Sequence, residues 1–281
     1  MQNTYLCINY DIRMRSSGFI TFIIILATLC HTADARKKDC KIIAHRGFWN
    51  CEEAGFAHNS VAALKCAQEA GIWGSEFDIC MTSDEILVVH HESKIDGKSI
   101  EKTPYADIQD FKLENGEPLP TIDDYLEQGK KYPGTILVYE IKPHSSTETE
   151  DRVIELSVAK LKEYELFSPD RVMFISFSIH ICETLAREYP EFSVQFLGSS
   201  RNPDELAEKG INGVDYNHMV YSIHKKWYRM ARKNNMSVNS WTVNNTVDMK
   251  RMLKLGVDYI TTDNPLTALE LTQGGKSARD D

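Results

Sequence analysis

Short apolar runs alternate with longer amphipathic segments along the chain from Lys41 onward. The short runs are rich in β-branched residues and predict strands, whereas the longer segments repeat their apolar positions at helical spacing. Eight short runs follow one another: Lys41 to His45, Trp73 to Cys80, Thr135 to Ile141, Arg171 to Phe177, Ser193 to Leu197, Asn212 to Tyr216, Ser237 to Val243 and Asp258 to Thr262. Strands that alternate with helices in this way indicate a parallel sheet of βα units.

Two of the helical segments carry end signals. Ser60 precedes a segment that runs to Ala70 and is followed by Gly71, a pattern that predicts an N-cap and a helix stop. Thr121-Ile-Asp-Asp124, directly after Pro120, is a capping-box pattern. These signals favour helices between the predicted strands.

Eight βα units within about 230 residues are typical of a TIM (β/α)8 barrel, which needs ~250 residues. An open doubly wound sheet is the alternative, yet no GxGxxG motif follows any predicted strand. The segment Met81 to Glu92 adds a short extended excursion after the second strand. We therefore expect an α/β fold, a TIM barrel with one such excursion at the end of the barrel where these enzymes keep their chemistry.

Residues 1–35 resemble a secretory signal peptide, because Arg13 and Arg15 precede an apolar run from Phe19 to Cys30 and then Ala33-Asp34-Ala35. Cleavage after Ala35 would leave residues 36–281 as a single barrel domain, exported to the periplasm or secreted. A membrane anchor is the alternative, but the run is about a dozen residues whereas a bilayer needs roughly 20. We therefore predict no stable membrane span in the mature chain.

Two further interpretations of the leader stay open. Met14 would serve as an alternative start. Lipid attachment at Cys30 is disfavoured by the bulky Leu29 before it.

The charge balance limits the partners of the mature chain. The leader carries two charges of each sign, so the mature chain keeps the net charge of -9. Binding to nucleic acid or to an anionic membrane needs a basic face, so neither is expected as the main partner. Five cysteines remain after the leader without a CxxC pair, and Cys40 with Cys51 is an open candidate for a disulfide.

Polar residues gather where the first three predicted strands end. They are His45-Arg46-Gly47, Glu76-Phe77-Asp78 and Glu140-Ile141-Lys142. Residues two apart in a strand share a face, so Glu76 and Asp78 point the same way. Three buried carboxylates that converge would repel one another unless a cation lies between them. Oxygen ligands favour Mg²⁺ or Ca²⁺.

The local charge then indicates the substrate. Three carboxylates with a divalent cation leave -1, and Arg46 with Lys142 bring the sum to +1. A phosphodiester monoanion suits that charge. The alternative for each acidic pair is a salt bridge that ties strand ends together, but both pairs beside a histidine favour a site.

His45 ends the first strand, and His90 and His91 end the excursion. Neighbours on an extended segment face opposite sides, so only one of His90 and His91 should reach the site. Two imidazoles beside a bound phosphate could act as general base and general acid. The other histidines are first assigned to the polar surface or to helix caps: His58, His144, His180, His218 and His224.

Taken together, these segments resemble the glycerophosphodiester phosphodiesterase family, of the bacterial exported type. The matching segments are AHRG (Ala44 to Gly47), SEFD (Ser75 to Asp78), LVVHHE (Leu87 to Glu92), YEIK (Tyr139 to Lys142), WTVN (Trp241 to Asn244) and DYITTD (Asp258 to Asp263). The resemblance implies one divalent cation on Glu76, Asp78 and Glu140, and His45 with His91 as the acid–base pair. It also implies phosphate contacts from Arg46 and Lys142, with Trp241 as a wall of the pocket.

The resemblance further implies metal-dependent cleavage of a small glycerophosphodiester to glycerol 3-phosphate and an alcohol, through a cyclic phosphate. Two residues depart from the family pattern: His58 stands where an acidic residue is usual, and Glu92 where Asp is usual. Two other functions stay open. One is a phospholipase C- or D-like barrel that acts on intact lipid across a lip of Phe48, Trp49 and Phe56, and the other is a non-catalytic binding barrel.

Overall fold

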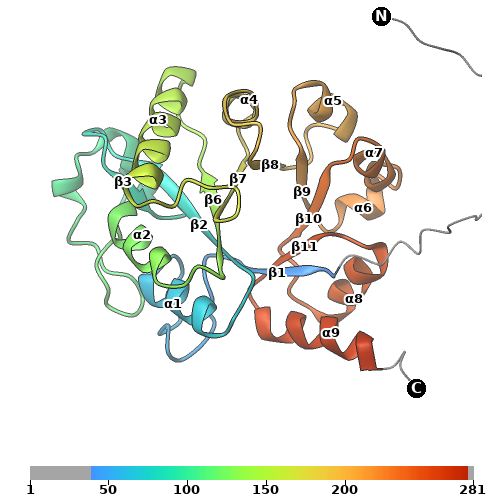
Figure 1. Ribbon diagram of the computed structural model, residues 1–281. Helices are drawn as coiled ribbons and strands as arrows, with labels where there is room; N and C mark the ends of the chain where they lie inside the picture. The colour runs from blue at the N-terminus through green and yellow to red at the C-terminus, as the bar shows by residue number, and fades with distance from the viewer. Residues whose placement is uncertain (1–38, 278–281) are drawn as a thin grey trace, which may run out of the picture. The chain divides into compact units, whose positions relative to one another are not determined.

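The structure, a computed structural model, describes residues 39–277 (Figure 1). The leader predicted for residues 1–35 lies outside the described residues. Within residues 39–277, eight parallel strands form a closed barrel: β1 (Lys41–Ala44), β2 (Gly74–Met81), β6 (Ile136–Ile141), β7 (Val172–Ser176), β8 (Ser193–Leu197), β9 (Gly213–Asn217), β10 (Ser237–Trp241) and β11 (Tyr259–Thr262).

The barrel closes because β1 pairs in parallel with both β2 and β11. The remaining strands pair with their neighbours in chain order, from β2 to β6 and on to β11. Each predicted run contains or overlaps one of these strands, so the TIM barrel is confirmed. The open doubly wound sheet is wrong.

Helices follow the barrel strands and surround them (Figure 1). They are α1 (Val61–Glu69), α2 (Ile122–Lys130), α3 (Thr147–Glu163), α4 (Ile179–Glu188), α5 (Pro203–Glu208), α6 (Val220–Ile223), α7 (Trp227–Lys233), α8 (Thr246–Leu255) and α9 (Pro265–Ser277). The Ser60 side chain accepts a hydrogen bond from the Ala63 amide and caps α1, and Thr121 with Asp124 forms the predicted capping box on α2. No helix within residues 39–277 is long and apolar enough to cross a membrane.

The excursion after β2 is longer than the predicted Met81 to Glu92. It contains β3 (Leu87–Val89), which pairs antiparallel with β2, then β4 (Lys94–Ile95), β5 (Lys98–Ser99), η1 (Ile100–Lys102) and η2 (Tyr105–Asp107). Its apolar side chains form a small core with Cys80 of β2: Val88, Ile95, Ile100, Ile108 and Leu119. The sequence pattern missed the later part because strands of two residues show no periodicity.

Side chains alternate between two layers along each barrel strand. On β9, Val214 and Tyr216 belong to the large cluster between barrel and helices, so Asp215 between them faces the barrel interior. The apolar part of the interior is a separate cluster of Ile43, Val138, Met173, Ile175, Leu197 and Tyr259. Strand-end residues in phase with this inner layer meet at one end of the barrel.

Cys40 and Cys51, the open candidates for a disulfide, are both free thiols in the structure. The Cys51 thiol instead donates to the Phe48 carbonyl oxygen, with 3.2 Å between the atoms. Burial raises the pKa of the Cys40 thiol to about 12, which keeps it protonated.

Candidate active site

Three buried carboxylates meet at one end of the barrel. Glu76 and Asp78 lie two residues apart on β2, and Asp78 is in register with Glu140 on β6. One oxygen from each lies within 4.8 Å of the others, as a shared metal ion requires. All three are at most 5% exposed, and their convergence agrees with the expectation that Glu76 and Asp78 share a face of the strand.

The pKa values of the three carboxyl groups reflect their burial and their closeness to one another. Burial and the neighbouring Asp78 and Glu140 charges raise the pKa of Glu76 well above its ordinary value. Burial and the Asp78 charge raise the pKa of Glu140 to about 8. Burial acts to raise the pKa of Asp78 as well, but Lys142, His91, Asn59 and Arg46 together outweigh it and hold this pKa at about 2. A cation is therefore favoured wherever all three are ionised.

Two cations already contact the triad. Lys142 Nζ lies 3.0 Å from Asp78 Oδ1 and 2.8 Å from Glu140 Oε1. Arg46 Nε lies 3.8 Å from Asp78 Oδ2. Both side chains thus stand beside the carboxylates, where an anion bound to the same centre would meet them.

The chain turns sharply after β1 to bring Arg46 here. Arg46 and Gly47 both have left-handed backbones, with φ of 55° and 80°. The turn directs the Arg46 amide to Glu76 Oε2 at 2.7 Å. Asn59, also at positive φ, donates its side-chain amide to Asp78 Oδ2 at 2.8 Å, a contact that sequence reasoning missed.

His45 is oriented by a carboxylate that sequence reasoning also missed. His45 Nδ1 lies 2.7 Å from Asp263 Oδ1, and the Trp49 indole N–H donates to the same oxygen at 3.2 Å. Ala44 pairs with Thr262 across the β1–β11 seam, so the next residue on each strand is a neighbour. A closed barrel requires the first and last strands to pair, and that pairing could have predicted the contact between His45 and Asp263.

His91 and His90 occupy different surroundings. His91 Nδ1 lies 2.8 Å from Glu92 Oε1, and its ring lines the same cavity as His45. The His90 ring packs edge-on against Phe111 at 5.6 Å and lines only an outer cavity. Burial lowers the pKa of His91, so the ring is neutral near neutral pH.

The central cavity holds about 180 Å³ and lies over the triad. Its walls are His45, Arg46, Glu76, His91, Glu140, Ile175, Phe177, Leu197, Asp215, Trp241, Thr242 and Thr261. Trp241 meets Phe177 edge to face at 5.6 Å and forms the apolar side. Arg46 and His91 also line a neighbouring cavity of about 430 Å³.

The model of the glycerophosphoryl diester phosphodiesterase family matches residues 45–267. This chain belongs to that family. Family membership makes the chain a phosphoric diester hydrolase.

Individual relatives of the family cover the barrel almost completely. A crystal structure of a glycerophosphodiester phosphodiesterase from Parabacteroides distasonis is 37% identical and covers 85% of this chain and 99% of its own, with a TM-score of 0.81. The glycerophosphodiester phosphodiesterase of Caldanaerobacter subterraneus is 27% identical over 83% of this chain and 98% of its own. An Oleispira antarctica phosphodiesterase, solved with the product sn-glycerol-3-phosphate, shares the fold at 22% identity with a TM-score of 0.70, over 83% of this chain and 96% of its own.

The two departures from the glycerophosphodiester phosphodiesterase pattern lie at the rim. His58 stacks on Trp49 with 3.7 Å between ring centroids and lies 4.0 Å from Glu114, outside the carboxylate triad. Burial and Arg46 lower the pKa of His58. Glu92 still reaches His91, so the longer side chain keeps that contact.

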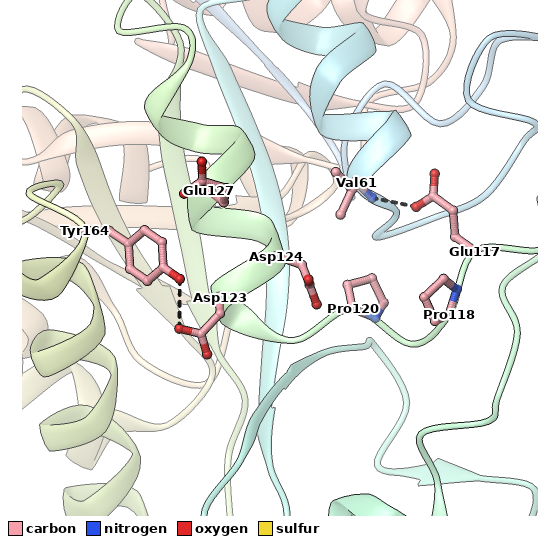
Figure 2. Close-up of a pocket in the computed structure, with 8 residues that line it drawn as sticks. All are labelled: Val61, Glu117, Pro118, Pro120, Asp123, Asp124, Glu127 and Tyr164. Atoms are coloured by element: carbon pink, nitrogen blue, oxygen red, sulfur yellow. Dashed lines mark hydrogen bonds between the residues drawn. The ribbon is translucent and has the colours of Figure 1, made fainter.

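A larger pocket lies away from this centre, between the start of α1 and the helices α2 and α3 (Figure 2). Three of its four carboxylates, those of Glu117, Asp123 and Asp124, make structural contacts. Glu117 accepts from the Val61 amide at 3.0 Å, Asp123 pairs with Lys160 and Tyr164, and Asp124 belongs to the α2 capping box. These contacts cap α2 or tie the surrounding segments together, so this pocket, the acidic groove, is not a candidate catalytic site.

Proposed function

We propose that this enzyme hydrolyses glycerophosphodiesters to glycerol 3-phosphate and an alcohol, with one Ca²⁺ or Mg²⁺ held by Glu76, Asp78 and Glu140. The observation that carries the proposal is the buried triad, whose ligand atoms lie within 4.8 Å of one another and whose Glu76 and Glu140 line the same cavity as His45 and His91. The product bound to the Oleispira antarctica phosphodiesterase, sn-glycerol-3-phosphate, supports the same product here.

The residues of the triad fit a hard divalent cation. Glu76 Oε1 is buried and has no hydrogen-bond partner in the described structure, so it offers a free ligand oxygen. The set contains only carboxylate oxygens, which suit Ca²⁺ or Mg²⁺ rather than zinc. When bound, such an ion would supply Lewis-acid activation of the phosphate.

The side chains around the triad suit a phosphodiester. Arg46 and Lys142 stand beside the carboxylates and would hold the phosphate oxygens. With the divalent ion, these five charges sum to +1, which matches a monoanion. His45 and His91 line the cavity within which the phosphate would lie.

The two histidines would exchange acid and base roles in two steps. First, the vicinal glycerol hydroxyl loses its proton to one imidazole and attacks phosphorus, while the other imidazole protonates the departing alcohol oxygen. The product of this step is a cyclic phosphate. Water then opens the ring, with proton transfers in the reverse sense, and glycerol 3-phosphate forms. Asp263 and Glu92 would orient the two rings.

The structure offers less support for a lipase. Of the three lip residues, Phe56 is exposed, but Phe48 packs against the core and Trp49 is held by Asp263 and His58. A non-catalytic barrel is disfavoured by family membership and by the intact triad. Nucleic acid remains an unexpected partner because of the net charge of -9.

The proposal includes export of the chain. The leader pattern in residues 1–35 supports a periplasmic or secreted single domain from residue 36. N-terminal sequencing of the protein recovered from its native cell would test this, and a mature chain that begins at Met1 would contradict it.

One assay separates these functions. Protein with added Mg²⁺ or Ca²⁺ is given glycerophosphocholine, glycerophosphoethanolamine, micellar phosphatidylcholine and bis(p-nitrophenyl) phosphate. We expect glycerol 3-phosphate from the first two and little turnover of the others, because they lack a free vicinal hydroxyl to act as the internal nucleophile. Faster cleavage of the lipid would support the lipase. Comparable rates on the aryl diester would indicate direct attack by water.

A further inference from the structure

Asp215 is a buried carboxyl group that the proposed mechanism does not use. It is 1% exposed, faces the barrel interior from β9 and lines the central cavity. Neither of its oxygens has a hydrogen-bond partner among the described residues. A buried polar group without a partner is unfavourable, so a ligand that hydrogen-bonds Asp215 from the cavity would be stabilised there.

The position of Asp215 in the barrel separates it from the triad. In the ring order of the eight strands, β9 stands four places from β2, so Asp215 lies across the barrel from Glu76 and Asp78. Trp241 is its neighbour, since the indole N–H donates to the Asp215 carbonyl oxygen at 3.0 Å. Asp215 is therefore a polar group on the otherwise apolar side of the cavity, beside Leu197 and Trp241.

The protonation state of Asp215 suits a ligand hydroxyl. Burial, and then the Glu140 charge, raise the pKa of Asp215 well above its ordinary value. A neutral carboxylic acid both donates and accepts a hydrogen bond, as an alcohol does. An alcohol can use both capacities of this group, whereas an anion without a proton can only accept from it.

We propose that the Asp215 side chain hydrogen-bonds the terminal hydroxyl of the substrate's glycerol part, and thereby selects diesters with a free glycerol arm. This inference rests on the proposed function, since it assumes that a phosphodiester is held between the triad and the histidines. The glycerol arm then extends from the phosphate across the cavity toward β9. An arm without the terminal hydroxyl leaves Asp215 unpaired.

The test crosses two substrates with the unaltered enzyme and its variants. The substrates are glycerophosphocholine and the phosphocholine ester of propane-1,2-diol, which keeps the vicinal hydroxyl but lacks the terminal one. We expect the unaltered enzyme to prefer glycerophosphocholine by about 10- to 100-fold in kcat/KM, the range for one hydrogen bond to a buried group. Asp215→Ala should reduce the preference to about threefold or less, and Asp215→Asn should restore part of it.

Gln195→Ala is the matched control. Gln195 lies on the adjacent strand β8, is fully buried and also has an unpartnered side-chain oxygen, but it does not line the central cavity. It should keep the preference. Thermal unfolding of each variant shows whether it folds, and Asp215→Asn keeps the test valid should the alanine variant not fold.

The outcomes are distinct. If the unaltered enzyme cleaves neither diester with Mg²⁺ or Ca²⁺, the proposed function fails and this inference with it. If it cleaves glycerophosphocholine but shows no preference, or if the preference survives Asp215→Ala or is lost equally in Gln195→Ala, only the role of Asp215 is overturned. Asp215 would then be a buried polar residue of the barrel interior with a structural role only.

Discussion

At the scale of single residues, alanine substitutions of the two adjacent histidines of the excursion should have different effects on turnover. The His91 ring lines the central cavity and contacts Glu92, whereas the His90 ring packs on Phe111. His91→Ala should lower turnover by about 10²- to 10⁴-fold, as expected for loss of a general acid or base. His90→Ala should cost far less. Steady-state kinetics on both variants, with circular dichroism as the folding control, decides the point, and an inactive His90→Ala beside an active His91→Ala contradicts it.

Asp263 should act on catalysis through His45. Its carboxylate accepts from the imidazole at 2.7 Å, and this contact, with those of Trp49 and Asn244, outweighs burial and holds the pKa of Asp263 below its ordinary value. Asp263→Asn should lower kcat by at least about 10-fold with a small change in KM, because the ring loses the partner that sets its tautomer.

The chain offers a matched control for Asp263. Asp151 Oδ1 on α3 lies 2.7 Å from His180 Nε2 on α4, the same distance as in the Asp263–His45 pair. Neither residue lines the central cavity. Asp151→Asn should leave kcat unchanged. Equal losses in the two variants would mean that the Asp263 effect is not catalytic.

At the scale of elements, the β1–α1 turn depends on one glycine. Gly47 has φ of 80°, and a Cβ there would lie 2.6 Å from Ala63 Cβ on α1. Gly97, between β4 and β5, has the same φ but open space around it. Gly97→Ala should therefore cost about 1–2 kcal/mol of unfolding free energy from backbone strain alone.

Gly47→Ala should cost at least about 1 kcal/mol more than Gly97→Ala, because it adds a steric overlap. It should also lower activity, since the turn sets the Arg46 amide against Glu76. Urea unfolding of both variants measures the difference. Equal costs would show that α1 moves away freely.

The elements also show what could be predicted from sequence. All eight residues of β2 are buried although Ser75, Glu76 and Asp78 are polar, so its recognition as a strand rested on the apolar residues between them and on its place in the βα alternation. The convergence of the triad was predicted from the polar residues at the ends of the first three strands, together with the alternation that puts Glu76 and Asp78 on one face. Asp263 and Asn59 were missed because each acts across a contact that local pattern does not encode: the β1–β11 seam joins His45 to a residue 218 positions away, and Asn59 reaches Asp78 from a left-handed turn.

At the scale of the whole molecule, the triad couples stability to pH. In metal-free protein, Glu140 has a pKa of about 8 when folded and 4.5 ordinarily, so the folded state holds a proton that the unfolded state releases. Stability from this group is complete below pH 4.5 and is lost as pH rises toward 8. The histidines with lowered pKa act in the opposite sense, but only below about pH 6.5.

Between pH 7 and 8, the unfolding free energy of chelated protein should therefore fall. Glu140 contributes about 1 kcal/mol to this fall, and the raised pKa values of Glu76 and Asp215 act in the same direction. Urea unfolding at the two pH values measures it. Glu140→Gln should show a fall smaller by about 1 kcal/mol. An identical fall in that variant, or a rise with pH, would show that Glu140 is not protonated in the folded protein at neutral pH.

The metal centre is tested most directly by calorimetric titration of chelated protein with Ca²⁺ and Mg²⁺, followed by glycerophosphocholine turnover on the same samples. We expect one ion per chain, with turnover restored in proportion to occupancy. Glu140→Gln should bind at least about 10-fold more weakly and turn over poorly, whereas Glu127→Gln in the exposed acidic groove should behave as the unaltered protein. Full turnover in excess chelator, with elemental analysis showing no bound metal, would show that the triad does not act through a metal ion.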